Sequence, residues 1–197
     1  MDVLAHYASA ELYIKNSRFL AEIIPVTGQN EAREQLKAQK EKYFDATHVV
    51  HAFIVGKAGE IMGMSDDGEP AGTAGRPVLD VLKGRNCTNI LLTVTRWFGG
   101  TLLGTGGLVK AYGDSAKAVL DKGIYVPLIE RRPFSFSLEY DLYNQVKRFL
   151  SDYDITEEKE DFGTDIHLSG LVPQDNFDAI QKYIISLTKG KVSTIEP

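Results

Sequence analysis

Residues 89–120 read NILLTVTRW FGGTLLGTGG LVKAYGDSAKAVL and divide into three parts of different character. The run Asn89–Trp97 is the most hydrophobic in the chain, which is typical of a strand at the centre of a sheet. The ten residues Phe98–Gly107 hold five glycines, which predicts a loop. Apolar residues then recur at helical spacing from Leu108 to Leu120. The stretch therefore predicts a central strand, a glycine-rich loop and an amphipathic helix.

A second strand–loop–helix unit precedes this one. The polar loop Ser65–Gly75 follows a predicted strand over Glu60–Met64 and leads into a helix after Pro77, because proline suits a first helical turn. Further upstream, alternating and helical patterns predict four more elements. They are strands near Glu11–Ile14 and Arg18–Ile24 joined by a turn at Asn16-Ser17, a helix over Glu31–Tyr43, and a strand over Val49–Val55. The order ββαββαβα predicts an α+β domain.

The last third of the chain has a different pattern, with sparse glycine and alternating aromatic residues. Its periodicities predict three strands, two helices and a closing strand. The strands cover Phe134–Tyr140, Ile155–Asp161 and Ile166–Val172; the helices cover Leu142–Tyr153 and, after an N-cap at Asp175, Phe177–Leu187; Gly190 stops the second helix, and Lys191–Ile195 is the closing strand. This βαββαβ order is that of a ferredoxin-like domain.

The segment Val126–Pro133 (VPLIERRP) separates the two patterns. Proline fixes its own φ and cannot donate to a β-ladder, so two prolines this close predict a linker. We therefore expect an N-terminal domain over residues 1–130 and a ferredoxin-like C-terminal domain over residues 131–197.

The composition excludes several classes of protein. Of 197 residues, 43% are hydrophobic and 25% are charged, as in an ordinary globular protein. The single cysteine, Cys87, excludes an intramolecular disulfide and cysteine-built zinc or iron–sulfur sites. Apolar runs are too short to span a bilayer, and the first residues lack a secretory layout, so we expect a cytoplasmic protein without a membrane partner. The net charge of −5 argues against binding to duplex DNA.

The two glycine-rich loops carry the candidate binding residues. Each loop lies between a strand and a helix, where glycine lets a ligand approach the backbone and the helix start offers unpaired N–H groups to an anion. The alternative is that the glycines only shape a tightly packed loop. The candidate residues are Asp66, Asp67, Glu69, Thr73, Arg76, Arg96, Gly99, Gly100, Gly104, Thr105, Gly106 and Gly107.

Tests of the loops against known ligand motifs are negative. Gly99 and Gly104 have Walker A spacing, but Thr105 stands where the lysine is required, and the G-x-G-x-x-G pattern also fails. The acids Asp66, Asp67 and Glu69 can gather a hard cation such as Mg²⁺, or can simply be turn residues. We predict no resident metal and no cofactor.

Arg96 lies at the end of a buried strand and needs partners there. One interpretation pairs it with an acid of the first loop, for example Asp66 or Asp67; the other directs it to a phosphate or a partner protein. His48 and His51 are three residues apart, so on a strand they face opposite sides and cannot share a metal. No serine lies in a G-x-S-x-G elbow, and no catalytic set can be recognised.

Two blocks resemble the signatures of a known family. Ser65–Leu82 (SDDGEPAGTAGRPVLDVL) and Ile90–Tyr112 (ILLTVTRWFGGTLLGTGGLVKAY) are similar to the two signature blocks of the IMPACT/YigZ family. The resemblance implies a bacterial two-domain member. Its first domain would share the fold of the fourth domain of elongation factor G and of a small-subunit ribosomal protein. The tail resembles another domain of elongation factor G. Val49, Val50 and His51 depart from a His/Cys cluster found in many relatives.

The resemblance also implies a function, because eukaryotic relatives regulate translation by competing for a ribosome-associated activator of an initiation-factor kinase. We therefore expect a non-enzymatic binding protein whose partner is the ribosome, RNA or a translation-associated protein. The alternative is an enzyme or binding protein for a small phosphorylated ligand, with Mg²⁺ as a candidate cation, at the loops Asp66–Gly75 and Arg96–Gly107. A third possibility is an adaptor whose loops form a surface for another protein.

Overall fold

A computed structural model describes residues 1–192 and has an α+β fold with five helices and three sheets in that range. The chain divides into two compact units, Met1–Leu128 and a second unit that begins at Ile129. Within residues 1–192, no helix is both long and apolar enough to cross a bilayer.

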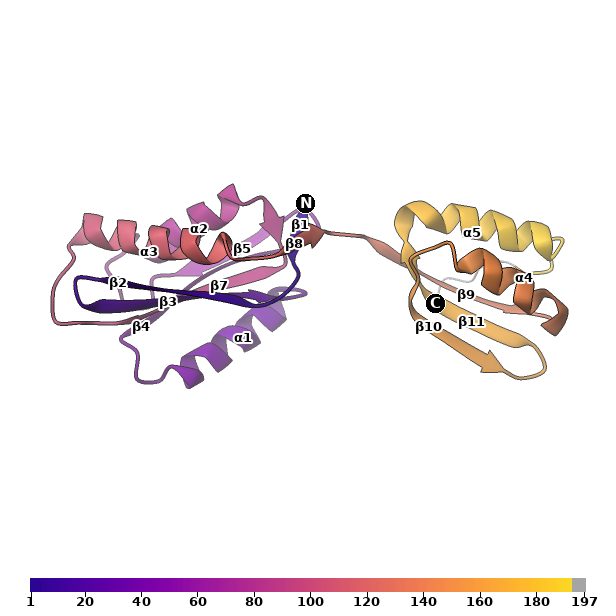
Figure 1. Cartoon of the computed structure of the whole chain (residues 1–197), viewed down its shortest axis with the longest axis horizontal. Coiled ribbons are helices and arrows are strands. Elements are labelled where there is room, and N and C mark those ends of the chain that lie inside the picture. Colours follow the sequence, from indigo (N-terminus) through magenta and orange to yellow (C-terminus); the bar gives the residue numbers. More distant parts are fainter. Residues whose placement is uncertain (193–197) are drawn as a thin grey trace. The chain divides into compact units, whose positions relative to one another are not determined.

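A five-stranded antiparallel sheet organises the first unit. Its spatial order is β2-β3-β7-β4-β5, so the hydrophobic strand β7 is central, as predicted. The strands are β2 (Ala8–Ile14), β3 (Ser17–Pro25), β4 (His48–Val55), β5 (Ile61–Ser65) and β7 (Ile90–Trp97). All but the last residue of β7 are buried, because helices cover both of its faces (Figure 1).

The hairpin between β2 and β3 turns one residue earlier than predicted. Lys15 and Asn16 both have positive φ, at 44° and 66°, and Ser17 already belongs to β3. A two-residue turn with positive φ at both positions matches the right-handed twist of the strands. The turn is therefore Lys15-Asn16, and the predicted turn Asn16-Ser17 is wrong by one residue.

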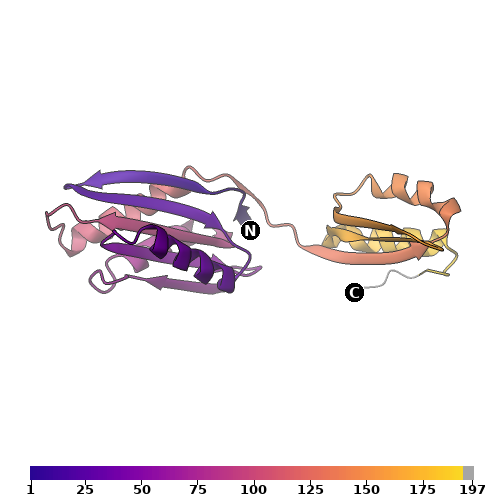
Figure 2. The ribbon, with the colours of Figure 1, turned by 90° about the horizontal axis from the view of Figure 1, so that it is seen from below.

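Three helices pack on the two faces of this sheet. Figure 1 shows α2 (Gly75–Gly84) and α3 (Thr105–Leu120) on one face and α1 (Gln29–Lys42) on the other. The largest apolar cluster lies under α2 and α3, and a smaller one lies under α1. Figure 2 shows α1 in front of one half of the sheet and the hairpin β2–β3 beside it, which agrees with the packing of α1 on β4 and β7.

A small second sheet was not predicted. Strands β6 (Cys87–Thr88), β1 (Asp2–Leu4) and β8 (Tyr125–Pro127) pair in that spatial order. Strands of two or three residues are too short to produce a periodic pattern. The predicted linker Val126–Pro133 is therefore mostly strand, because β8 ends at Pro127 and the next strand begins at Arg131.

The second unit has the order β9 (Arg131–Leu138), α4 (Tyr140–Leu150), β10 (Thr156–Phe162), β11 (Ile166–Pro173) and α5 (Gln174–Leu187). Its antiparallel sheet has the order β10-β11-β9, which is consistent with a ferredoxin-like domain. Its buried apolar residues form a core of their own.

The structure bears on three predictions for the last part of the chain. Gly190 has a φ of +78° and its N–H bonds the carbonyl of Ile185 at 2.8 Å, so it ends α5 as predicted. The predicted N-cap at Asp175 is wrong, since Pro173 holds that position and Asp175 lies in the first turn. The predicted strand Lys191–Ile195 falls mostly outside the described residues, and Lys191 and Val192 are not in a strand.

Candidate functional site

A pocket of about 400 Å³ lies where the two glycine-rich loops meet, over the end of β7 and the start of α3. Most of its wall is apolar, and its polar groups gather at one side. The apolar residues are Pro70, Phe98, Leu102, Leu103 and Leu108; the others are Thr47, His48, Glu69, Arg96, Gly104 and Thr105. Apolar concavities of this volume with a few polar groups are the usual form of ligand sites. Of the candidate residues, Glu69, Arg96, Gly104 and Thr105 line it.

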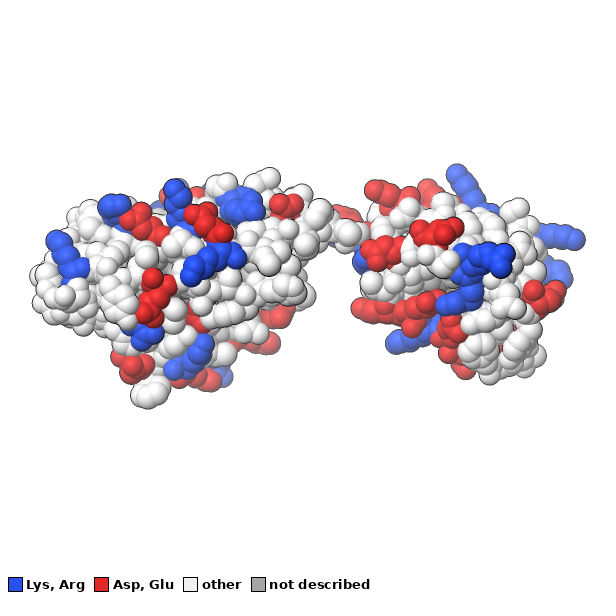
Figure 3. Space-filling view, in the orientation of Figure 1, with Lys and Arg blue, Asp and Glu red and all other residues white. Residues whose placement is uncertain are grey.

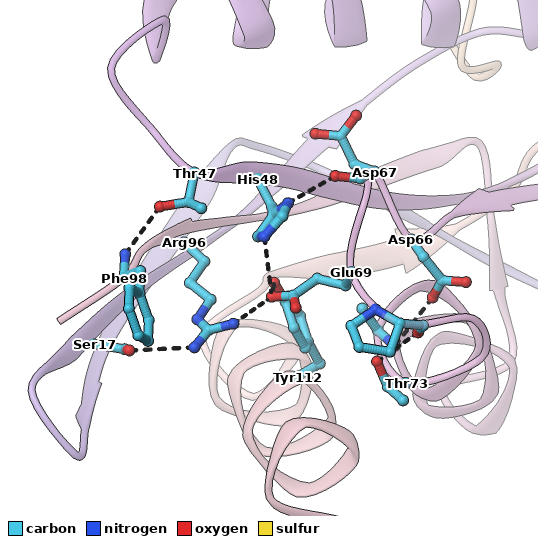
Figure 4. A network of polar contacts seen from close by, with 12 residues as sticks. Ser17, Thr47, His48, Asp66, Asp67, Glu69, Thr73, Arg96, Phe98 and Tyr112 are labelled. Carbon is cyan, nitrogen blue, oxygen red and sulfur yellow. Dashed lines mark hydrogen bonds and ion pairs between the residues drawn. The ribbon is translucent and has the colours of Figure 1, made fainter. Parts of the chain in front are cut away.

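The polar side of the pocket is a buried ion pair. Arg96 Nη1 donates to Glu69 Oε1 at 2.6 Å, and the two side chains are 6% and 3% exposed (Figure 4). Burying either charge alone would be strongly unfavourable, so each requires the other. The partner of Arg96 is therefore Glu69, which confirms the predicted pairing with an acid of the first loop, although that acid is neither Asp66 nor Asp67.

Three further side chains complete this network. The Tyr112 hydroxyl donates to Glu69 Oε1 at 2.7 Å, and burial, followed by the adjacent carboxylate, raises the pKa of Tyr112 above its ordinary value. His48 places Nε2 3.8 Å from Glu69 Oε1, while its Nδ1 lies 2.8 Å from the carbonyl oxygen of Asp67. Because a carbonyl only accepts, Nδ1 carries the proton. Arg96 Nη2 also donates to Ser17 Oγ at 3.4 Å.

Asp66 holds the first loop against the start of α2. Its carboxylate accepts N–H bonds from Gly72, Ala74 and Gly75 at 2.9, 3.1 and 2.8 Å. Burial acts to raise the pKa of Asp66, but the three backbone donors outweigh it and the pKa lies below the ordinary value. Asp66 is therefore a loop and helix-start residue rather than a pocket residue.

Asp67 points toward α1. It accepts from Lys40 Nζ at 2.5 Å and from the Val49 N–H at 2.7 Å. Burial opposes the charged form of Asp67, yet the Lys40 ammonium and the Val49 N–H lower its pKa overall. Asp66, Asp67 and Glu69 thus have three separate sets of partners and do not converge on one point. In the described part of the chain, no three His, Cys, Asp or Glu side chains are placed to hold a metal.

Two other candidates of the first loop also lie away from the pocket. The Thr73 hydroxyl donates to the Pro70 carbonyl at 2.7 Å and so tightens the loop. Arg76 pairs with Asp80 one helical turn later, at 2.9 Å and in solvent. Arg76 therefore contributes to the surface of α2 and not to the candidate site.

The glycines of the second loop have different roles. A Cβ on Gly99 would lie 2.0 Å from the Asn16 carbonyl oxygen, so only glycine allows this approach of the loop to the β2–β3 hairpin. Gly104 has a φ of +73° and is the N-cap of α3. Thr105, Gly106 and Gly107 form the first turn of α3, while Gly100 has open space around it. Only Gly104 and Thr105 line the pocket.

The two histidines face opposite sides of the sheet, as predicted. His48 joins the Glu69 network, whereas His51 lies on the face covered by α1. Burial and the nearby Lys40 ammonium lower the pKa of His51 to about 4. Because they lie on opposite faces, His48 and His51 cannot bind the same ligand.

Sequence reasoning missed most of the pocket wall. Thr47, Pro70, Leu102 and Leu103 carry no motif of their own, and Tyr112 reads as one more residue of a helical apolar face. One usable signal existed, because a tyrosine in a buried stripe needs a partner for its hydroxyl. That partner is Glu69.

Comparison with known proteins gives the family. The Impact N-terminal domain matches residues 15–120, and a domain of unknown function (DUF1949) matches residues 136–191. This chain belongs to the IMPACT family. The resemblance of the two signature blocks is thereby confirmed.

Individual relatives agree with this assignment. The IMPACT family member YvyE of Bacillus subtilis is 32% identical over 92% of this chain and 83% of its own length. An IMPACT family member of Haemophilus influenzae is 33% identical over 91% of this chain and 88% of its own. A crystal structure of a hypothetical protein is 28% identical with a TM-score of 0.74, over all of this chain and 96% of that one.

In this IMPACT family member, the charged groups of the pocket wall are paired with each other, since Arg96 contacts Glu69. The His48 proton is directed to a carbonyl of the loop. What remains open to a ligand is an apolar wall and the start of α3.

Proposed function

We propose that this chain is a non-enzymatic binding protein that acts in translation, through a protein partner associated with the ribosome. The observation that carries the proposal is the pocket between the two glycine-rich loops. Two large apolar residues of its wall are exposed, Phe98 by 44% and Leu102 by 82%. Neighbouring exposed apolar side chains are typical of a surface that binds another protein. The link to translation rests on family membership and on the likeness to elongation factor G that the resemblance implies.

The charge distribution favours a protein partner over RNA. Arg96, the basic residue of the pocket wall, is occupied by Glu69. Figure 3 shows acidic and basic side chains interspersed over the visible face of the first unit, without a broad basic area. RNA binding relies on unpaired basic groups near the phosphates, so its affinity falls steeply with salt. We therefore expect an association that persists at moderate salt.

The proposal extends to the organisation of the chain. We propose that residues 1–130 form the partner-binding domain, in the cytoplasm, and that residues 131–197 form a ferredoxin-like domain similar to one of elongation factor G. The alternative of a phosphorylated ligand with Mg²⁺ loses its cation site, since Asp66, Asp67 and Glu69 are engaged separately. Its remaining support is the start of α3.

Co-sedimentation with ribosomes from the cells that produce the protein tests the proposal. The wild type is compared with Leu102→Ser, which removes an exposed leucine from the pocket wall, at low and moderate salt. Ile124→Ser is the matched control, because Ile124 is 64% exposed on the same unit and does not line the pocket. We expect association of the wild type and the control at both salts, and its loss in Leu102→Ser.

Two results contradict the proposal. A wild type that stays in the supernatant at both salts removes the link to the ribosome. An association that disappears at moderate salt and is indifferent to Leu102→Ser points to RNA phosphates instead. Thermal melting of all three proteins checks that neither exposed substitution unfolds the chain.

A further inference from the structure

Strand β5 forms one edge of the five-stranded sheet, with β4 as its neighbour among the described residues. The backbone N–H and C=O groups of an edge strand that point away from the sheet can pair with a further strand. Which residues of β5 carry these outward groups follows from the hydrogen bonds of β4.

Two side-chain acceptors show how the backbone of β4 is oriented. The Val49 N–H donates to the Asp67 carboxylate, just beyond the end of β5, at 2.7 Å, so it points to the β5 side. The Gly56 N–H, directly after β4, donates to the Asn89 side chain beside β7 at 3.2 Å, so it points to the β7 side. Successive residues of a strand direct their N–H and C=O groups to opposite sides. The odd-numbered residues of β4 therefore face β5.

The register then identifies the outward groups of β5. Phe53 is odd-numbered and lies opposite Gly63, so Gly63 exchanges hydrogen bonds with β4. The residues on either side, Met62 and Met64, therefore direct their N–H and C=O groups to the free edge. Their side chains lie on the α2 side of the sheet, opposite β4 residues of the large apolar cluster, and each methionine is 44% exposed.

Two other edges in the chain carry features that discourage strand addition. Edge strand β10 has four acids and one lysine in seven residues, and its register with β11 shifts between Thr156 and Lys159. At the opposite edge of the five-stranded sheet, Lys122 Nζ donates to the Ser9 carbonyl of β2 at 3.2 Å. The sequence IMGMS of β5 has no charge and no proline, and its register with β4 is continuous. Because charges, prolines and bulges are the usual protection of an edge, β5 is open to a further strand.

A second copy of this chain is a poor occupant of the β5 edge. Pairing of Met62 with Met64 of the second copy would place Glu60 opposite Asp66, and both are acids. The five residues of β5 are also far fewer than the roughly 20–30 residues a side of a standard interface. A short segment of another protein meets neither obstacle.

The end of β5 selects the charge of such a segment. Asp66 follows β5 directly, and among the described residues its carboxylate is held by three backbone N–H groups before and at the start of α2 rather than by a basic side chain. In the alternation of the strand, Asp66 lies on the same side as Met62 and Met64. An antiparallel segment with apolar side chains beside both methionines therefore brings the residue two positions before them to this carboxylate. A basic residue complements the charge there.

We propose that the free edge of β5 binds an extended segment of a partner protein, in which a basic residue is followed by apolar residues at alternate positions. The segment pairs with the N–H and C=O groups of Met62 and Met64, and its basic residue contacts Asp66. Strand addition is a recurrent mode of peptide recognition, and methionine adapts to varied apolar partners. The inference goes beyond the proposed function, because β5 does not line the pocket between the glycine-rich loops.

An amide-resolved NMR titration of the ¹⁵N-labelled full chain with the peptide acetyl-KTVTVT-amide tests the inference. In antiparallel pairing its two valines lie opposite Met64 and Met62, and its lysine lies opposite Asp66. We expect shifts of the signals of residues 61–66, and about threefold weaker binding of acetyl-ETVTVT-amide, in which glutamate replaces the lysine. The absence of shifts at β5, or equal binding of the two peptides, overturns the inference.

Methylation of the peptide backbone separates strand pairing from simple apolar contact. A methyl group on the nitrogen of the first valine removes the donor to the Met64 carbonyl, whereas a methyl group on the nitrogen of the next threonine points to solvent. We expect the first change to weaken binding at least about fivefold, as for the loss of one hydrogen bond, and the second to change it little. Equal effects of the two methyl groups overturn the inference.

Two substitutions at Met62 repeat this comparison on the protein. Met62→Pro removes an N–H that points away from β4, a position where an edge strand tolerates proline. Met62→Ala shortens the side chain and keeps the N–H. We expect the proline variant to bind acetyl-KTVTVT-amide about fivefold more weakly than the alanine variant, and equal binding overturns the inference. Melting curves of both variants show whether they are folded, and the methylated peptides decide the matter if the proline variant is not.

The remaining outcomes separate this inference from its alternatives. Shifts of the β5 signals on raising the protein concentration alone assign the edge to a second copy and overturn the inference. The Leu102→Ser variant should bind the peptide as the wild type does. Ribosome association without peptide binding at β5 therefore overturns this inference alone, and peptide binding without ribosome association overturns only the proposed function.

Discussion

The two faces of the five-stranded sheet bury a glutamate each, in contrasting surroundings. Under α2 and α3, Glu69 is paired with Arg96 and Tyr112 beside the largest apolar cluster. Toward α1, Glu22 is fully buried and its Oε1 accepts from Tyr7, Tyr43 and Lys42, but its Oε2 has no partner among the described residues.

The unsatisfied polar atoms of the described chain gather on the second of these faces. Five of the six belong to residues on strands or the helix of the α1 side: Glu22 Oε2, Gln39 Oε1, His51 Nδ1, Thr93 Oγ1 and Thr95 Oγ1. The helix above them buries only Ala32 and Gln39. The α2/α3 face is therefore held by apolar packing around a paired charge, whereas the α1 face is held largely by polar contacts. The pocket occurs on the better packed face.

The largest expected effect comes from breaking the paired charge. Arg96→Met leaves Glu69 buried without its cation, so we expect the free energy of unfolding of the first unit to fall by about 3–5 kcal/mol. Urea unfolding followed by fluorescence of the single tryptophan, Trp97, measures this unit.

The double variant Arg96→Met/Glu69→Gln is the control for this prediction. It removes the stranded charge and should recover part of the lost stability. A loss of less than about 1 kcal/mol in the single variant would mean that water reaches Glu69 and that the ion pair is not a buried one.

Substitution of two adjacent leucines of β7 compares how much each face of the sheet contributes to the free energy of unfolding. Leu92 packs in the large cluster and Leu91 in the small one, and both are 0% exposed. Leu92→Ala should cost about 4 kcal/mol and Leu91→Ala about 2–3 kcal/mol, because the site under the polar helix α1 relaxes more easily around the deleted atoms. The same urea experiment measures both values, and equal losses would contradict the contrast in packing.

Acid should weaken the α1 face selectively. The pKa of His51 is lowered to about 4, so between pH 6.5 and 4 the unfolded chain binds a proton that the folded chain does not. Stability due to neutral His51 is present above pH 6.5 and is lost as the pH falls, by about 2 kcal/mol between pH 7 and 5.

The variant His51→Gln isolates this contribution. Its unfolding free energy should depend less on pH over that interval than that of the wild type. Asp67, Lys40 and Glu22 are the charged groups nearby on α1 and the sheet, and they remain in both proteins. If the unfolding free energies of the wild type and of His51→Gln depend on pH in the same way, the His51 ring is exposed to solvent and the prediction is wrong.

The smallest expected effects come from removing one hydrogen-bond donor from each buried glutamate. Tyr112→Phe removes one of two hydrogen-bond donors to Glu69 and should cost about 2 kcal/mol, while Tyr43→Phe removes one of three donors to Glu22 and should cost about 1 kcal/mol. Both substitutions keep the ring contacts, with Phe19 and Trp97 respectively. Thermal melting at neutral pH compares them, and the reverse order would contradict the proposed difference.

Much of the fold could be predicted because its signals are local. The run of apolar residues in β7, the glycines after it and the helical spacing from Leu108 identify that unit without any tertiary information. The predictions were wrong for very short strands and at the ends of helices and strands. The sheet β6-β1-β8 pairs residues more than eighty positions apart through strands of two or three residues, which no local pattern announces.

The candidate site was predicted as two loops but not as a set of contacts. Asp66, Asp67 and Glu69 are equivalent in a sequence, since all three are acids within four positions. The folded loop directs Asp66 to the start of α2, Asp67 to Lys40 and Glu69 to Arg96. Each direction depends on where distant strands and helices place the donors.

The sequence by itself determined the order of the main elements, the central strand, the two signature loops and the family, because these depend on periodicity and on neighbouring residues. Only the tertiary structure decided that Glu69 neutralises Arg96, that Leu102, Leu103 and Leu108 close an apolar wall, and that the start of α3 opens into the pocket. The physical reason is that burial and pairing are properties of groups brought together by the fold. A charge becomes a structural partner or a binding group according to what lies within about 3 Å of it.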